Sequence, residues 1–158
     1  MRSDSLNSSS GKYGLNKIRT IVRVQDDAIT MELGPNDSGC LVLLRACGGA
    51  KKVNLPDASG NDGVWYDVYQ HEASDGVTTI QTLDGTDFFL GTVADGESGS
   101  AAEVAFNGSS HDQMTIASGT AAGEFEMRLV CDGDNWLIMH GVSQDISDIA
   151  AATSSDNT

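Results

Sequence analysis

The chain has 158 residues, 39% of them apolar, which is enough for one domain with a buried core. Its formal net charge of −14 is distributed unevenly. Residues 1–52 carry eight basic and five acidic groups, a net +3, whereas residues 53–158 carry one arginine and eighteen acids, a net −17. The acidic part would repel nucleic acid and anionic lipid, so we expect neither a nucleic acid nor a membrane as its partner.

The first part of the chain predicts an arm followed by short strands. Residues 1–17 are mainly polar and basic, which predicts an arm that is flexible or that orders only against a neighbouring subunit. Residues 18–24 alternate apolar and polar side chains and predict a half-buried strand. Residues 28–33 are a plausible partner strand, so we expect a hairpin over 18–33. Short apolar runs between turn residues predict three further strands at 41–46, 51–55 and 64–69.

The rest of the chain repeats this alternation of strand and turn. Turn signals recur about every 8–12 residues, the spacing of an all-β sandwich or barrel. Strands are predicted at 77–83, 88–93, 103–106, 113–117, 124–130 and 136–142. We therefore predict an all-β fold, an antiparallel β-sandwich or barrel-like domain at 18–142 with an extended N-terminal arm at 1–17. Residues 143–158 are predicted to be an acidic C-terminal tail, in which 145–152 forms at most one or two helical turns.

The cysteines predict a protein that is made in a reducing compartment. Cys40, Cys47 and Cys131 adjoin apolar runs, and three cysteines in a chain of this length do not make a disulfide framework. We expect buried free thiols. Residues 1–17 lack the apolar stretch of a signal peptide, and no run reaches the roughly 18 apolar residues of a membrane span.

No local motif predicts catalysis or metal binding. The histidines are His71, His111 and His140, and no ligand spacing joins them to each other or to the cysteines. No GxSxG motif marks a nucleophile. The Asp-Gly-rich stretches lack the ligand pattern of a calcium loop and are typical of hairpin turns, although a structural calcium ion stays open. We therefore predict a protein that is not an enzyme, with no catalytic residue, cofactor or metal.

The aromatic side chains are few and lie in apolar strands, so we expect most of them in the core. Trp65 and Tyr66 are neighbours in one predicted strand and must point to opposite faces. One of the two is therefore expected to be available for a partner.

The order of short motifs between Gly39 and Gly141 resembles that of small virion structural proteins of tailed bacteriophages, including head-decoration (cement) proteins. The resemblance covers about two thirds of the chain. The corresponding stretches are Ala46-Cys47-Gly48, Val53-Asn54-Leu55-Pro56, Tyr66-Asp67-Val68, Val77-Thr78-Thr79-Ile80, Asp87-Phe88-Phe89-Leu90-Gly91, and Asp132-Gly133-Asp134-Asn135-Trp136 through Gly141. The spacing to Gly91 departs by one residue from the shorter form of its motif.

The resemblance implies a homotrimer on the outer surface of the capsid that binds the major capsid protein and stabilises the mature head. Such a protein is assembled in the host cytoplasm and becomes part of the virion. It identifies no catalytic residue. The basic segment is the expected capsid contact, through charge-assisted hydrogen bonds or strand addition, with the residues Arg2, Lys12, Lys17, Arg19 and Arg23.

Two alternatives predict a different partner. A tail-fibre, head-fibre or spike module would bind host surface glycans and would present an exposed aromatic or Asp-rich pocket. A secreted carbohydrate-binding domain would present the same kind of site but would need a signal peptide.

Overall fold

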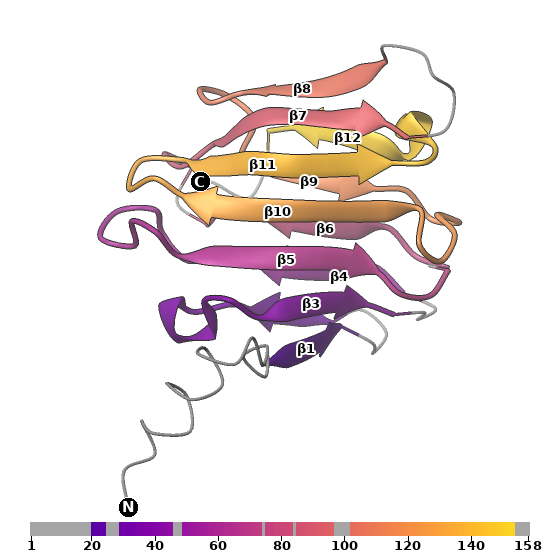
Figure 1. Cartoon of the computed structure of the whole chain (residues 1–158), viewed down its shortest axis with the longest axis horizontal. Coiled ribbons are helices and arrows are strands. Elements are labelled where there is room, and N and C mark those ends of the chain that lie inside the picture. Colours follow the sequence, from indigo (N-terminus) through magenta and orange to yellow (C-terminus); the bar gives the residue numbers. More distant parts are fainter. Residues whose placement is uncertain are drawn as a thin grey trace, which may run out of the picture.

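The computed structural model describes residues 20–24, 29–45, 49–73, 75–83, 85–96 and 102–153, which form a sandwich of two β-sheets (Figure 1). The seven-stranded sheet contains, in spatial order, β1 (Ile21–Val24), β3 (Leu41–Leu44), β5 (Trp65–Gln70), β10 (Phe125–Cys131), β11 (Trp136–Ser143), β7 (Phe89–Asp95) and β8 (Glu103–Asn107). The five-stranded sheet contains β12 (Ile149–Ala152), β9 (Gln113–Ile116), β6 (Thr78–Gln81), β4 (Lys51–Asn54) and β2 (Thr30–Glu32). Two short 3-10 turns accompany them, η1 (Pro35–Asp37) and η2 (Ile146–Asp148). No helix in these ranges is long and apolar enough to cross a bilayer.

The prediction of an all-β sandwich is confirmed, but its sheets are mixed rather than purely antiparallel. Strands β1 to β6 alternate between the two sheets, so each strand lies beside the strand two places along the chain and runs in the same direction. Strand β7 is also parallel to its neighbour β11. The antiparallel pairs join β5 with β10, β10 with β11, β7 with β8, β6 with β9 and β9 with β12.

The expected hairpin over 18–33 is wrong, because β1 and β2 lie in opposite sheets. Strand β1 pairs with β3, and β2 pairs with β4. Alternation of apolar and polar residues does indicate the buried face of β1 correctly, since Val24 is fully buried and Arg23 is exposed. A buried face can be satisfied in either sheet, so the pattern alone does not select the neighbouring strand.

The core lies between the sheets and contains two stacked aromatic rings. Tyr66 and Trp136 are both fully buried and stack with their ring centroids 5.5 Å apart. Each ring also satisfies its polar atom: the Tyr66 hydroxyl donates to the Gly34 carbonyl (2.7 Å), and Trp136 Nε1 donates to the Pro56 carbonyl (3.2 Å). The two rings thus tie the β5–β10–β11 region to the loops at one end of the sandwich without leaving a buried donor unpaired.

The C-terminal part of the described chain belongs to the sandwich rather than to a tail. Strand β11 continues to Ser143, and β12 pairs with β9 in the five-stranded sheet. Between them, the Asp145 carboxylate accepts from the Ser147 backbone N–H (3.0 Å) and starts the single turn of η2. The expected helical turns over 145–152 are therefore one 3-10 turn and a strand. The predicted arm at 1–17 lies outside the described residues.

Candidate functional site

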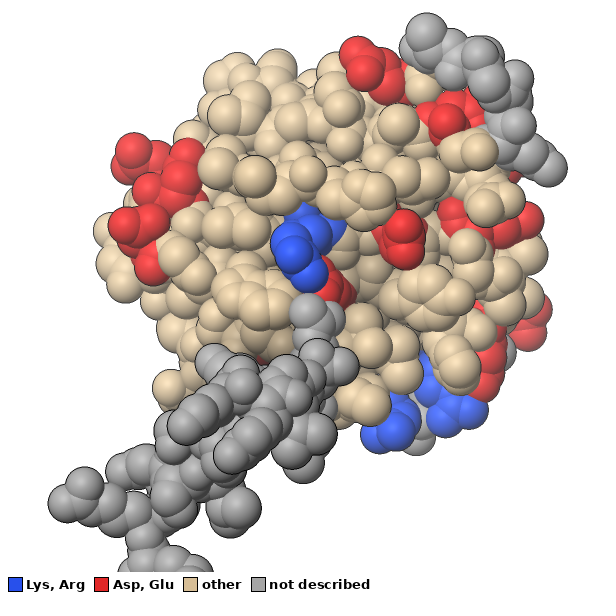
Figure 2. Space-filling view, viewed as in Figure 1, with Lys and Arg blue, Asp and Glu red and all other residues tan. Residues whose placement is uncertain are grey.

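The two outer faces of the sandwich have opposite character. Side chains on the outer face of the five-stranded sheet are mostly polar: Thr30, Glu32, Lys52, Asn54, Thr79, Gln81, Gln113 and Thr115. The outer face of the seven-stranded sheet carries many apolar side chains: Ile21, Leu41, Leu43, Trp65, Tyr69, Leu90, Val130, Leu137 and Met139. Figure 2 shows this second face, where charged groups lie near the centre and along the rim of a largely uncharged surface. Apolar side chains gathered on an exposed sheet face are typical of a binding surface.

A β-bulge in β11 shapes the middle of this face. His140 pairs with Arg128 and Ile138 with Leu129, so Met139 is one residue more than β10 can match. The register against β7 shifts in the same interval. As a result, Met139 and His140 are consecutive and yet both exposed, and Met139 is 62% exposed. A bulge that re-aims side chains in this way is common beside binding sites.

Two glycines make room for the bulge. A Cβ atom on Gly91, whose φ is 134°, would lie 2.9 Å from the Ile138 carbonyl oxygen. A Cβ atom on Gly141 would lie 3.0 Å from Cγ2 of both Ile138 and Val93. Gly91 ends the motif that begins at Asp87, and Gly141 ends the motif that begins at Asp132. Both motifs belong to the resemblance to phage structural proteins, and in the fold both glycines lie against Ile138 of β11.

Beside the bulge, the sheet face is hollowed by about 570 Å³. This is within the usual volume range of ligand sites, about 300–1,000 Å³. The hollow spans β3, β5, β10 and β11 and is lined by Leu41, Asp67, Val68, Tyr69, Glu126, Met127, Arg128, Met139 and His140.

Arg128, the single basic residue of the acidic part of the chain, is held in this hollow by two neighbours. Its Nε and Nη2 atoms donate to the two carboxylate oxygens of Asp67 on β5, at 2.6 and 2.9 Å. Its guanidinium carbon lies 4.9 Å from the centroid of the Trp65 ring. The hydrogen bond to Asp67 raises the pKa of Arg128 and outweighs the opposing effect of burial. Arg128 therefore keeps its positive charge at every physiological pH.

A second polar pair lies across the same strands. His140 Nε2 is 3.0 Å from Glu126 Oε1, and both side chains are more than half exposed. Exposed pairs of this kind contribute little to stability. Their placement at the rim of the hollow gives it an acceptor, the Glu126 carboxylate, beside the donors of Arg128.

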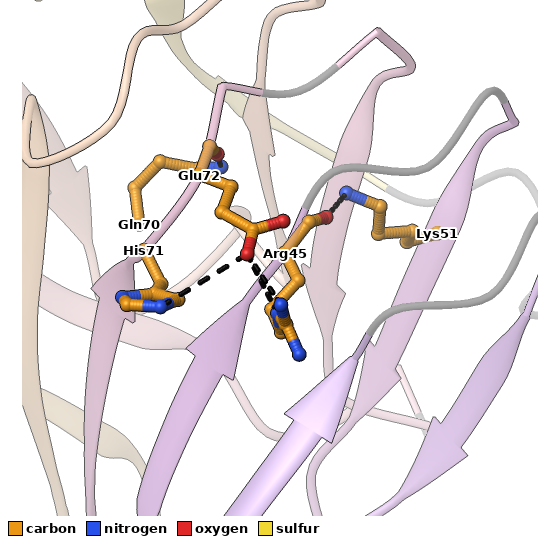
Figure 3. A network of polar contacts seen from close by, with 5 residues as sticks. All are labelled: Arg45, Lys51, Gln70, His71 and Glu72. Atoms are coloured by element: carbon orange, nitrogen blue, oxygen red, sulfur yellow. Dashed lines mark hydrogen bonds and ion pairs between the residues drawn. The ribbon is translucent and has the colours of Figure 1, made fainter.

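A different polar network lies where β3 and β5 end and β4 begins (Figure 3). The fully buried Lys51 donates from Nζ to the Arg45 carbonyl (2.5 Å), and the Arg45 guanidinium pairs with Glu72. His71 Nε2 is 4.0 Å from Glu72 Oε1, and the buried Gln70 side chain donates to the Glu72 carbonyl. These contacts join the ends of strands from both sheets, so we interpret the network as structural.

The predicted contact residues are only partly placed by the structure. Arg23 is exposed on β1, at the edge of the seven-stranded sheet. The other four, Arg2, Lys12, Lys17 and Arg19, lie outside the described residues.

The buried-thiol prediction holds for two of the three cysteines. Cys40 and Cys131 are free and buried, and Cys47 lies outside the described residues. Burial is the main cause that raises the pKa of both thiols, to about 11 for Cys40, so both are poor nucleophiles. Nearby Asp37 adds to the effect on Cys40.

The Asp-Gly stretches serve as turns where the structure describes them. Asp132 Oδ1 accepts the backbone N–H groups of Asp134 and Asn135 within such a turn. Asp87 Oδ2 instead accepts the backbone N–H of Ala58 and so links two of these stretches. Within the described ranges, no group of three or more His, Cys, Asp or Glu side chains is arranged to hold a metal ion.

The hollow itself was not predicted. Alternation in residues 124–130 correctly places Glu126 and Arg128 on the outer face, which was the available signal. Its other polar partners, Asp67 and His140, come from strands whose pairing no local pattern gives.

A comparison with known protein families, curated proteins and solved structures found no match to this chain.

Proposed function

We propose that the protein is a decoration (cement) protein of a tailed-phage head. It binds the major capsid protein as a homotrimer on the outside of the capsid and stabilises the mature shell. The observation that supports this proposal most directly is the open edge of β1, which immediately follows the basic segment of the chain.

Strand β1 offers backbone groups for strand addition. Among the described strands it pairs only with β3. The carbonyls of Thr20 and Val24 accept hydrogen bonds from the β3 side. Because backbone groups alternate in direction along a strand, those of Ile21 and Arg23 point away from the sheet. A partner strand laid along this edge would pair with them.

Charge directs the partner to the same edge. Residues 1–23 carry five basic groups and one acid, whereas residues 53–158 carry a net charge of −17. Basic side chains lie at the lower edge of the face in Figure 2, where Figure 1 draws β1 and β3. An acidic capsid surface would be attracted by this edge and repelled by the acidic residues 53–158. This difference in charge would fix the orientation in which the protein docks.

Stabilisation of the shell would follow from mass action. A protein that binds only the expanded capsid stabilises it by RT ln(1 + [L]/Kd), about 2.7 kcal/mol per site when the free concentration is 100 times Kd. Many equivalent sites on one shell would add these contributions.

The test compares variants of the full chain in binding to expanded capsids that lack the protein, measured by co-sedimentation. Arg23→Glu reverses an edge charge, Ile21→Pro removes one outward N–H while leaving the bonds to β3, and Ala150→Glu is the control on the opposite sheet. We expect binding to fall for the first two variants and not for the control. We also expect deletion of residues 1–17 to abolish binding while the body stays folded. Full decoration by the truncated protein would show that the basic segment is not the contact.

A further inference from the structure

We propose that the hollow on the outer face of the seven-stranded sheet binds an uncharged glycan. Arg128 and Glu126 would bond to its hydroxyl groups, and Tyr69 and Met139 would cover an apolar face of a sugar ring. Glycan binding goes beyond capsid binding and uses a surface other than the β1 edge. An experiment can therefore disprove either the capsid contact or the glycan site without affecting the other.

The donor of the site is the free edge of the Arg128 guanidinium. A guanidinium has five N–H donors, and the bonds to Asp67 use one on Nε and one on Nη2. One N–H of Nη1 and the second N–H of Nη2 lie parallel at the end of the guanidinium, and the Nη1 group and this N–H have no hydrogen-bond partner among the residues that the structure describes. Two parallel N–H groups of this kind match two oxygen atoms on adjacent carbons.

The fork is held in place before any ligand arrives. Asp67 fixes the plane of the guanidinium, and the Trp65 ring supports it from one side. A ligand therefore does not have to order a long flexible side chain, which is the main entropic cost of binding through arginine.

The acceptor of the site is Glu126. Its Oε1 atom faces His140 at 3.0 Å, and within the described chain its Oε2 atom has no hydrogen-bond partner. A hydroxyl group can accept from Arg128 and donate to Glu126, so a hydroxyl-rich ligand uses both groups. A ligand with only acceptors or only donors would use one of them.

The walls of the hollow suit the remaining surface of a sugar. Leu41, Tyr69 and the largely exposed Met139 provide apolar and aromatic surface between the polar groups. Sugar rings present C–H groups on their faces and hydroxyls at their edges, and an aromatic or thioether side chain packs against the former.

Charge selects an uncharged ligand. The charges of Arg128, Asp67 and Glu126 sum to −1, and residues 53–158 carry a net charge of −17. An anionic ligand would be repelled by Glu126 and by the acidic residues 53–158. A cationic ligand would face the positive charge of Arg128, which offers no hydrogen-bond acceptor. A peptide is disfavoured because the backbone groups in the middle of a sheet are already paired, whereas peptides that add to sheets use edges.

The experiment probes the full chain on an array of neutral hexose and N-acetylhexosamine oligosaccharides, with acidic glycans and a peptide library as further arms. We expect retention on neutral glycans that stays nearly constant from about 50 to about 500 mM salt, because no net charge is exchanged. Arg128→Lys keeps the charge but loses the fork, and Glu126→Gln loses one acceptor. Each is expected to weaken binding about tenfold or more.

Two variants complete the test. Glu103→Gln, an exposed change on the edge strand β8, is the matched control and should bind as the unchanged protein does. Met139→Ala removes an exposed wall of the hollow, so it should fold normally and bind more weakly even if a charged-residue variant fails to fold. Retention on no neutral glycan, retention only on acidic glycans or peptides, or unchanged binding by Arg128→Lys and Met139→Ala would overturn the proposal.

Discussion

Replacing Gly91 beside the β11 bulge should cost more stability than replacing a glycine in an open turn. The change to make is Gly91→Ala, and its consequences follow from two separate terms. At a φ of 134° an alanine adopts a backbone conformation that is essentially restricted to glycine, at a cost of about 1–3 kcal/mol. The new methyl group would also lie 2.9 Å from the Ile138 carbonyl oxygen and 3.0 Å from its Cβ. Overpacking of this kind costs about 1–3 kcal/mol, because the neighbours are backbone and a β-branched side chain.

Two control variants separate these terms. Gly141→Ala introduces crowding against Ile138 and Val93 and should cost about 1–3 kcal/mol. Gly60→Ala has a φ of 79° but nothing within 4 Å of the new Cβ, so it should cost only the backbone term, about 1–2 kcal/mol. Gly91→Ala combines both terms, and its loss of unfolding free energy should therefore be about 2–5 kcal/mol.

The assay is urea unfolding of the full chain, followed by tryptophan fluorescence, because Trp136 is fully buried on the strand that carries the bulge. The midpoint should fall most for Gly91→Ala and less for Gly141→Ala and Gly60→Ala, with an unchanged slope. Equal losses for Gly91→Ala and Gly60→Ala would show instead that the bulge has room for a side chain.

Three further outcomes follow from individual contacts. The pKa of Cys40 rises from 9.0 to about 11 on folding, so the unfolded chain loses this proton first and stability falls as pH rises from about 9 to 11, by about 2–3 kcal/mol. Urea midpoints should show a smaller alkaline fall for Cys40→Ala, and an identical fall would contradict this. Asp67→Asn breaks a partly exposed ion pair with Arg128 and should cost less than about 1 kcal/mol in thermal unfolding. A larger loss would mean that the pair is structural. Lys51→Met leaves the Arg45 carbonyl without its buried donor and should cost about 1–3 kcal/mol in urea unfolding, whereas a more stable variant would argue against that bond.

Local sequence patterns were sufficient to predict most strands and their buried faces. Residues 124–130 alternate strictly, and Phe125 is buried while Glu126 and Arg128 are exposed, as predicted. Trp65 and Tyr66 lie on opposite faces of β5, with Tyr66 in the core and Trp65 on the outer face beside Arg128. Such patterns are reliable because the side-chain period of a strand is a local property of the backbone.

Strand pairing was not predictable in the same way. The 18–33 hairpin was expected because neighbouring strands often pair, but β1 and β2 cross between sheets instead. The strand at Ile149–Ala152 was missed because three alanines in a row carry no alternation, and only pairing with β9 gives them a partner. Pairing is decided by which faces and edges remain available after the whole chain has packed.

Turn residues, alternation and charge are local properties of the chain, so they were sufficient to predict a β-sandwich in which residues 53–158 are strongly acidic. That Asp67, Arg128 and His140 meet in one hollow follows from the pairing of β5, β10 and β11, which no local pattern contains. Unbroken alternation from Trp136 would have turned His140 inward with Ile138. The bulge turns His140 outward instead. It forms where β11 pairs with β10 and with β7, and both pairings have a register shift that the sequence pattern does not indicate.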